Sequence, residues 1–504
     1  MLDAGFPAAV HCRTGFWGSL PTPGLLLQTQ YGQPVHLLRS VLKSVPWDGT
    51  AVAGVRFGHM WSLVSDAAAT KSGGLSNYCN LDGRAAVLLQ RDPASFHISP
   101  ATDAAALVST WGGRRRVTPA EYMAVVAQLR PDVAVALHDE VTHNTGNNRT
   151  RESISRSLRW LDACVAALSS TVSETVTSPR TRLLAYVPIL SDAVARARAI
   201  TDIVAHINAA NSIIATTSTS PSSPADSGPV IVGIVLGGLF HGESSAERRH
   251  ALADVVAKLP PELVRLLPGP RTVLEMFDAV AAGVDIVDSD YVTNLTRHGC
   301  AAVFRFEWSV ADEVPSVDGA VVARDVADGR TSPTAALPRS QYAFQRAVPQ
   351  RRHACGSTNK AEAAAPEEAS VAVTSDSSLL NLRDVKHAMD AGPLVQGCPC
   401  FACSGLDSNS AAMLISSASA GAEADGSTRP VVARGHSRAY IHHLQETHEM
   451  LGDVLLAVHN TSHAARFMMR LRSIVATASQ SGHDVSDTLA AYRAWLIDVN
   501  GFSE

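Results

Sequence analysis

The sequence predicts an α/β protein built on a (β/α)8 TIM-type barrel. Short apolar runs that end in polar or acidic residues recur along the chain, as in 133–141 (VAVALHDEV), 183–190 (LLAYVPIL), 230–240 (VIVGIVLGGLF) and 284–290 (VDIVDSD). Buried parallel strands have this pattern, and helical patterns fall between these runs. An α/β barrel carries its site at the carboxyl ends of its strands, so the polar residues ending these runs are the first candidates for a functional site.

Two helices can be placed from capping signals and apolar spacing. Thr118 is expected to cap a helix that begins at Pro119, with Glu121 completing a capping box. The run 157–168 (SLRWLDACVAAL) is amphipathic and predicts a second helix. Near the C-terminus, 440–460 carries apolar residues near helical spacing, so one long helix is expected there.

The 504 residues, of which 46% are apolar, are enough to bury a large core. Three segments rich in small and polar residues, 215–229, 309–378 and 405–430, predict disordered insertions. We therefore expect a barrel domain over 1–308, the disordered insertion 309–378, and a C-terminal subdomain with helices over 379–504.

Charge and cysteine usage restrict the class of protein further. The formal net charge of −5 provides no overall attraction for nucleic acid, so contact with RNA would need a local patch or a basic partner. Neither a signal peptide nor an apolar run of membrane-spanning length is evident, which predicts a cytoplasmic protein without integral membrane association. Five isolated cysteines fit reduced thiols better than disulfides: Cys12, Cys79, Cys164, Cys300 and Cys355.

The remaining three cysteines are clustered and predict a metal site. Cys398, Cys400 and Cys403 present three thiolates within one tight turn. Three sulfurs and one imidazole form a closed tetrahedral set for one structural Zn²⁺ per chain. The spacing leaves the histidine open among His436, His442, His443, His448, His459 and His463.

Several motifs resemble one family. The segments 392–403 (GPLVQGCPCFAC), 436–444 (HSRAYIHHL) and 455–460 (LLAVHN) are similar to the zinc subdomain of the queuine tRNA-ribosyltransferases, also called tRNA-guanine transglycosylases. The resemblance implies that His459 is the fourth zinc ligand. It follows Cys403 by 56 residues, a longer interval than the family pattern. The insertion 405–430 accounts for the excess, since the entropy of loop closure grows only logarithmically with length.

The resemblance extends through most of 12–308 and 380–475 and assigns residues at the barrel mouth. Catalytic members exchange a base in tRNA with a nucleophilic aspartate that holds the ribose and a second aspartate that moves protons. Asp288 matches the nucleophile position and Asp139 the carboxylate that binds the base edge. Gly238 and Leu239 match the base-contacting glycine strand.

Three departures argue against catalysis by this chain. The family's Asp-Ser-Gly-Gly-Phe-Gln segment, which brings the acid/base aspartate, has no counterpart before the helix at Pro119, where 104–117 (AAALVSTWGGRRRV) stands. Loss of that carboxylate would slow proton transfer on the order of 100- to 10,000-fold. The base-reading glutamine near the end of 183–190 is absent, and the Pro-Thr-Arg run reads Val-Thr-Asn at 292–294. No catalytic residue is therefore expected, and Asp288 is interpreted as a vestigial nucleophile position.

These patterns resemble the accessory subunit of the eukaryotic heterodimeric enzyme more than its catalytic subunit. The implied role is to pair with a catalytic queuine tRNA-ribosyltransferase subunit and to help hold a tRNA with a GUN anticodon during guanine-for-queuine exchange at the wobble position. Peripheral association with the mitochondrial outer surface is left open. The alternatives are an active transglycosylase that uses Asp288, with Asp103 as substitute acid/base, and an unrelated zinc-stabilised binding barrel.

Arg114, Arg115 and Arg116 are the candidate tRNA contact. Consecutive charges most often form a solvated surface, but three arginines in a loop can also grip a phosphate backbone. Three tryptophans are expected to anchor the core or an interface rather than stack on bases: Trp61, Trp111 and Trp160.

Overall fold

The computed structural model describes residues 12–37, 39–42, 45, 52–61, 71–81, 83–92, 98–170, 181–217, 228–307, 378–405 and 435–502. The described residues before and after the segment 309–376 belong to one compact unit. The predicted insertion 309–378 lies outside the described residues except for Ser378, and 405–430 does so except for Gly405. Of 215–229, the helix α7 takes up the first residues through Thr217, and 218–227 are not described.

Eight parallel strands close into a barrel, which confirms the predicted fold class. Around the ring the strands are β3 (Gly24–Gln30), β5 (Val52–Arg56), β6 (Ala86–Leu89), β9 (Val133–Val135), β10 (Arg182–Pro188), β11 (Ile231–Gly237), β12 (Val264–Leu267) and β13 (Ile286–Asp288). Strand β13 pairs with β3, with Asp288 beside Leu26, and this pairing closes the ring. The four predicted apolar runs supply β9, β10, β11 and β13.

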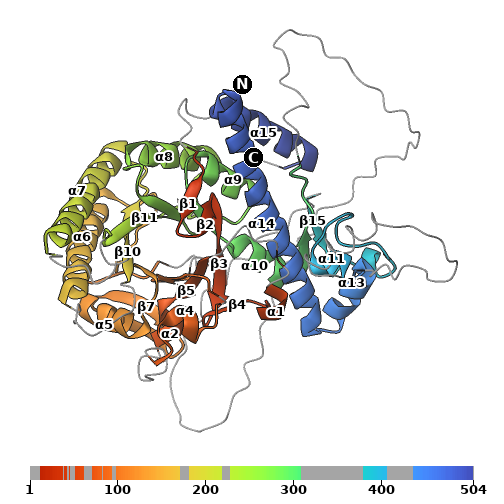
Figure 1. The fold of residues 1–504 in the computed structure, drawn as a ribbon, viewed down its shortest axis with the longest axis horizontal. Coiled ribbons are helices and arrows are strands. Elements are labelled where there is room, and N and C mark those ends of the chain that lie inside the picture. The colour runs from red at the N-terminus through yellow and green to blue at the C-terminus, as the bar shows by residue number, and fades with distance from the viewer. Residues whose placement is uncertain are drawn as a thin grey trace, which may run out of the picture. The chain divides into compact units, whose positions relative to one another are not determined.

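Helices surround the strands, as Figure 1 shows. They are α5 (Pro119–Leu129), α6 (Asn147–Ser170), α7 (Ala193–Thr217), α8 (Ser245–Lys258), α9 (Val273–Ala281) and α10 (Asp290–Arg297). The predicted capping box of α5 is confirmed, because the Thr118 hydroxyl accepts from the N–H of Glu121 and the Glu121 carboxylate accepts from the N–H of Thr118. Strands β1 (Gly15–Trp17) and β2 (Leu20–Thr22) bring Trp17 and Leu20 against the core inside the barrel.

A two-stranded hairpin leaves the barrel between β6 and α5. It consists of β7 (Ala106–Thr110) and β8 (Gly113–Val117), paired antiparallel through a two-residue turn at Trp111 and Gly112. The hairpin lies on the short helix α2 (Phe57–Met60). Gly58 makes this approach possible, since a Cβ there would lie 1.9 Å from the carbonyl oxygen of Ser109. Smaller elements nearby are β4 (Gln33–Pro34), α1 (Arg39–Leu42) and α4 (Leu75–Tyr78).

The C-terminal residues pack on the barrel through one long helix. The elements are β14 (Cys300–Ala302), β15 (Leu379–Asn381), η2 (Val385–His387), α11 (Phe401–Ser404), α13 (Arg438–Glu446), α14 (Met450–Ser481) and α15 (Val485–Asn500). Asn460 on α14 is fully buried, and its amide bonds the backbone of Ala302 and Cys300 and the hydroxyl of Thr296. These bonds satisfy a buried amide and hold α14 against β14 and α10.

The prediction of one continuous helix over 440–460 is wrong, because the chain forms two helices there. Helix α13 ends at Glu446 and α14 begins at Met450, with His448 between them at φ 57°. The helices then pack closely at Gly452, where a Cβ would lie 2.9 Å from the Gln445 amide nitrogen. Apolar spacing does not reveal such a break, because both helices present apolar residues to the same core.

No helix within the described ranges is both long enough and apolar enough to cross a membrane.

Candidate metal centre and barrel-mouth site

The structure brings three cysteines and one histidine into a buried cluster. The Nδ1 atom of His459 lies 3.4 Å from the Sγ of Cys403, 3.5 Å from that of Cys400 and 3.9 Å from that of Cys398. All four ligand atoms lie within 4.8 Å of one another. Among the histidines that the spacing left open, His459 is the one in this cluster.

Local structure explains how these side chains converge. Cys400 caps the short helix α11 and Cys403 lies within it, so one turn aims both sulfurs the same way. Gly435 passes so close to Cys403 that a Cβ there would lie 1.8 Å from its carbonyl oxygen. His459 comes from the middle of α14, and its Nε2 bonds the carbonyl of Ala302 at 2.8 Å. That bond orients the ring so that Nδ1 faces the sulfurs, as second-shell bonds do for metal-bound histidines.

The distances and the donor types fit a tetrahedral zinc ion. With Zn–S near 2.3 Å and Zn–N near 2.05 Å, tetrahedral angles put sulfur and nitrogen about 3.5 Å apart. The three observed separations from Nδ1 bracket this value. Burial excludes water from all four groups, and three thiolates with one imidazole would leave no open ligand position.

Asp288, at the end of β13, is fully buried among hydrogen-bond donors. One of its oxygens accepts from the N–H of Gly269 at 2.8 Å and from the Gln28 amide at 3.4 Å. The other accepts from the N–H of Asp290 at 3.1 Å. Burial, followed by the charge of Asp290, raises the pKa of Asp288 to about 8. The raised pKa favours the protonated form of this carboxyl group, whereas a carboxylate nucleophile must be ionised.

A second carboxylate, which is not among the residues predicted from the sequence, lies at the mouth in the loop after another strand. Asp92 comes three residues after β6 and pairs with the Nη1 of Arg56 at 2.7 Å. Its charge also raises the pKa of Asp288 and of Asp290. The segment 104–117, where the sequence predicts that this carboxylate is missing, contains the hairpin outside the barrel. The position of Asp92, three residues after the apolar run 86–89, is the signal that marks it in the sequence.

Asp290 follows Asp288 and is also buried. Its Oδ1 has no hydrogen-bond partner among the described residues, while Oδ2 accepts from the Asn294 amide at 3.3 Å. Burial first, and the charge of Asp92 next, raise the pKa of Asp290 to about 6. Asp288 and Asp290 are therefore coupled, and each favours the protonated form of the other.

Asp139, at the mouth beyond β9, is held by two arginines. Both guanidinium nitrogens of Arg149 bond its carboxylate, at 2.6 and 2.7 Å, and Arg156 pairs with one of the same oxygens. Arg149 and Arg156 are seven residues apart on α6, so both project from one face of the helix toward β9. The carboxylate is completely buried, and both of its oxygens are engaged by these cations.

Asp103 belongs to the same network. Arg156 bonds its carboxylate at 2.9 Å and Arg159 does so at 3.4 Å. The side chain is largely exposed, and these guanidinium groups lower its pKa, the Arg156 hydrogen bond most of all. Asp103 is thus an ionised outer member of the Asp139 cluster, which does not favour the acid/base role considered for it.

Gly238 and Leu239 line a small hollow at the mouth, with Arg91, Glu140 and His241 on its other sides. Gly238 has φ 91°, and a Cβ there would lie 2.7 Å from the carbonyl oxygen of Val141. Glu140 pairs with Arg91, whose charge lowers the pKa of the carboxyl group to about 2 against the effect of burial. The hollow therefore holds an internal ion pair.

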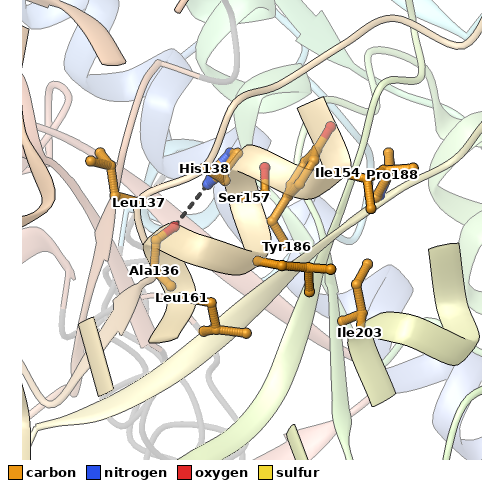
Figure 2. A pocket seen from close by; sticks show the side chains of 10 residues that line it. Ala136, Leu137, His138, Ile154, Ser157, Leu161, Tyr186, Pro188 and Ile203 are labelled. Carbon is orange, nitrogen blue, oxygen red and sulfur yellow. Dashed lines mark hydrogen bonds between the residues drawn. The ribbon is translucent and has the colours of Figure 1, made fainter. Parts of the chain in front are cut away.

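A second hollow lies between the barrel wall and helices α6 and α7 (Figure 2). In it the ring of Tyr186 stacks on His138 at 4.1 Å, and a Cβ on Gly237 would lie 2.5 Å from that ring. Figure 2 shows the apolar side chains that surround the stack and the bond from His138 to the carbonyl of Ala136. The Ser157 hydroxyl accepts from the N–H of Asp139. Since these polar groups are already bonded, we interpret this hollow as a packing gap.

The three predicted arginines lie on the exposed strand β8. Arg115 holds its guanidinium 4.7 Å from the centre of the Trp61 ring, a cation–π contact. Trp111, at the turn of the hairpin, is 84% exposed, so of the two roles expected for it, a core anchor or an interface anchor, exposure excludes the core. Trp160 is buried, as expected for a core residue.

The fold and these clusters define an α/β-barrel protein with a buried Cys3His group near its C-terminus. The family model described as queuine tRNA-ribosyltransferase matches residues 13–481. The chain belongs to the queuine tRNA-ribosyltransferase family.

Its relatives include proteins named queuine tRNA-ribosyltransferase accessory subunit 2. The protein of that name from Danio rerio is 25% identical over 467 residues, covering 91% of this chain and 89% of the relative. Those from Anopheles gambiae and Homo sapiens are 24% and 25% identical over 475 and 371 residues. These alignments cover 92% and 72% of this chain and 82% and 68% of the two relatives.

Proposed function

We propose that this chain is the non-catalytic accessory subunit of a heterodimeric queuine tRNA-ribosyltransferase. It would pair with a catalytic subunit and support exchange of guanine for queuine at the wobble position of tRNAs with GUN anticodons. Family membership and the names of the relatives support this role. The proposal includes a cytoplasmic location for the complex, with peripheral attachment at the mitochondrial outer surface left open.

The observation that carries the non-catalytic reading is the arginine pair around Asp139. A base-binding carboxylate must offer free oxygens to the N–H groups of a purine edge. Both oxygens of Asp139 are already occupied by Arg149 and Arg156 in a buried setting. Removing a guanidinium from a buried carboxylate costs several kcal/mol. One hydrogen bond from a base contributes less than that.

The states of the other acids support the same reading. The raised pKa of Asp288 favours its protonated form, and Asp92 is paired with Arg56. A nucleophile and its proton-transfer partner would need the reverse arrangement, one ionised and the other free to exchange a proton.

We also propose that Cys398, Cys400, Cys403 and His459 hold one structural Zn²⁺. When bound, the ion would supply folding energy by tying α11 to the middle of α14. The predicted division into a barrel over 1–308 and a zinc subdomain over 379–504 is part of this proposal.

Exposed apolar side chains near the cluster support a partner surface there. Val385 and Met389 lie in and beside η2, and Tyr440 and His443 lie on α13, which contacts η2. Met389 is 91% exposed, and exposed apolar residues that group on neighbouring elements indicate an interaction surface.

Native mass spectrometry of the full chain mixed with candidate catalytic subunits tests the proposal. A one-to-one complex is expected, and Met389→Asp with Tyr440→Asp should weaken it. Phe16→Asp, an exposed aromatic on β1, is the matched control. Failure of every catalytic subunit to form a complex would contradict the accessory role.

The second candidate function is an active transglycosylase. The presence of Asp92 and Asp288 on different strands of one barrel mouth favours it, since base exchange needs two carboxylates. Exchange of labelled guanine into tRNA by the chain alone, lost in Asp288→Ala and in Asp92→Ala, would establish it.

A further inference from the structure

We propose that an aromatic surface on the rim of the barrel mouth binds an unpaired nucleotide of an RNA by stacking and phosphate contact. This surface, here called the aromatic rim, consists of Tyr31, His59, Trp111, Arg114 and Arg116. The proposal deepens the proposed function. The statement that the natural RNA is a tRNA rests on that function. Binding of RNA by the chain itself is testable without it.

Three aromatic rings form the centre of the rim. Tyr31, in the turn after β3, stacks on His59 of α2 with 4.5 Å between centroids and 22° between planes. Trp111 approaches Tyr31 edge-on at 6.1 Å and 72°. Trp111 is 84% exposed and Tyr31 43%, so large ring surfaces face solvent. Aromatic faces of this kind are the platforms on which single-stranded nucleic acids stack.

The rim is held rigid by contacts that leave these faces free. The N–H of Tyr31 donates to the Nδ1 of His59 at 3.2 Å. Gly58, next to His59, lets the hairpin lie directly on α2. Arg115, on the inner face of β8, anchors the hairpin through its contact with Trp61. A surface fixed in advance loses little conformational entropy on binding.

Positive charge lies on the same hairpin that carries Trp111. Side chains alternate along a strand, so Arg114 and Arg116 lie on the face of β8 opposite to Arg115. Both are exposed. Arginine and exposed aromatic rings together match a single strand of nucleic acid, in which phosphates and bases alternate. A partner protein with an acidic surface would use the positive charge but would not require exposed ring faces.

The rim lies beside the vestigial site. Tyr31 follows β3 and His59 follows β5, so both lie at the carboxyl ends of barrel strands. Burial and then the charge of Arg56 lower the pKa of His59, while Asp92 raises it. His59 is therefore within electrostatic reach of the mouth residues, and its ring supports that of Tyr31 from one side. An RNA strand that covers the mouth would meet the rim with a neighbouring nucleotide.

Fluorescence titration of the full chain with a labelled anticodon stem-loop RNA and with oligouridine tests the rim. Both RNAs should bind and quench tryptophan emission. Trp111→Ala should weaken binding roughly 10-fold, the size expected when one stacked base is lost, and Trp111→Phe should restore most of it. Phe16→Ala is the matched control, since Phe16 is 78% exposed on β1, away from the rim. Arg114→Gln with Arg116→Gln should reduce the slope of log affinity against log salt concentration by about 0.7 for each phosphate contact that is lost.

The outcomes separate this proposal from the accessory role. Unchanged RNA affinity in Trp111→Ala overturns the rim, even if the chain still forms its complex and supports exchange. Loss of complex formation in Trp111→Ala without loss of RNA affinity shows instead a protein interface and also overturns it. If no catalytic partner is found, the accessory role fails. The effect of Trp111→Ala on RNA affinity still tests whether the aromatic rim binds RNA. Circular dichroism melting of each variant checks that the fold is retained.

Discussion

Replacement of Asp139 by asparagine tests whether this residue is a structural acid or a base reader. Asp139→Asn preserves shape and one acceptor oxygen but removes the charge that Arg149 and Arg156 share. Removing one partner of a fully buried ion pair costs about 3–5 kcal/mol. Here Arg156 still forms its ion pair with Asp103, and the Arg149 side chain is 34% exposed to water. Both cations therefore remain partly stabilised after the substitution. We expect a loss of about 2–3 kcal/mol in the free energy of unfolding.

The assay is urea unfolding followed by circular dichroism, together with the exchange rate of the reconstituted complex per folded chain. Asp139→Asn should lower the free energy of unfolding and leave the exchange rate unchanged. Asp103→Asn is the control, because Asp103 is largely exposed and should contribute far less. Unchanged stability combined with loss of exchange would refute the structural reading, since it would show that Asp139 contacts the base.

Three further predictions concern the metal, the pH response and the backbone. Cys400→Ser and His459→Ala should lose stoichiometric zinc in atomic emission and unfold at lower temperature, whereas His442→Ala, whose ring bonds the carbonyl of Leu382, should retain the metal. The folded-state pKa of Asp288 is raised, so its carboxyl group loses its proton at lower pH in the unfolded chain than in the folded one. This group therefore lowers the free energy of unfolding as pH rises from about 4 to about 8. Asp288→Asn should therefore gain stability relative to the unsubstituted chain across that window, and a difference independent of pH would contradict the raised pKa. Gly238→Ala should lower the free energy of unfolding by about 1–3 kcal/mol through its positive φ and its contact with Val141, and by more than Gly242→Ala, where φ is also positive but space is open.

The barrel could be predicted from the sequence because its signals are local. The runs that form β9, β10, β11 and β13 are apolar over the length of a strand, and Thr118, Pro119 and Glu121 define the start of α5 by their own chemistry. The three clustered cysteines are similarly self-evident. Each of these features depends on residues that are neighbours in the chain.

The rest of the site depends on residues far apart in sequence. Local spacing did not choose His459 among six histidines, because α14 brings it to the sulfurs and is held there by bonds from the His459 and Asn460 side chains to the backbone of Ala302. The arginine pair on Asp139 comes from α6, and Asp92 lies before 104–117, the segment that stands in place of the family's acid/base motif. Tertiary contacts decide these points, and a single sequence does not report them.

The exchange assay tests the central claim most directly. The purified chain is incubated with labelled guanine and a tRNA with a GUN anticodon, first alone and then with a catalytic subunit. The account predicts no incorporation by the chain alone and incorporation on adding the partner, with Asp288→Ala in this chain leaving the complex active. Incorporation by the chain alone that disappears in Asp288→Ala would contradict the non-catalytic role.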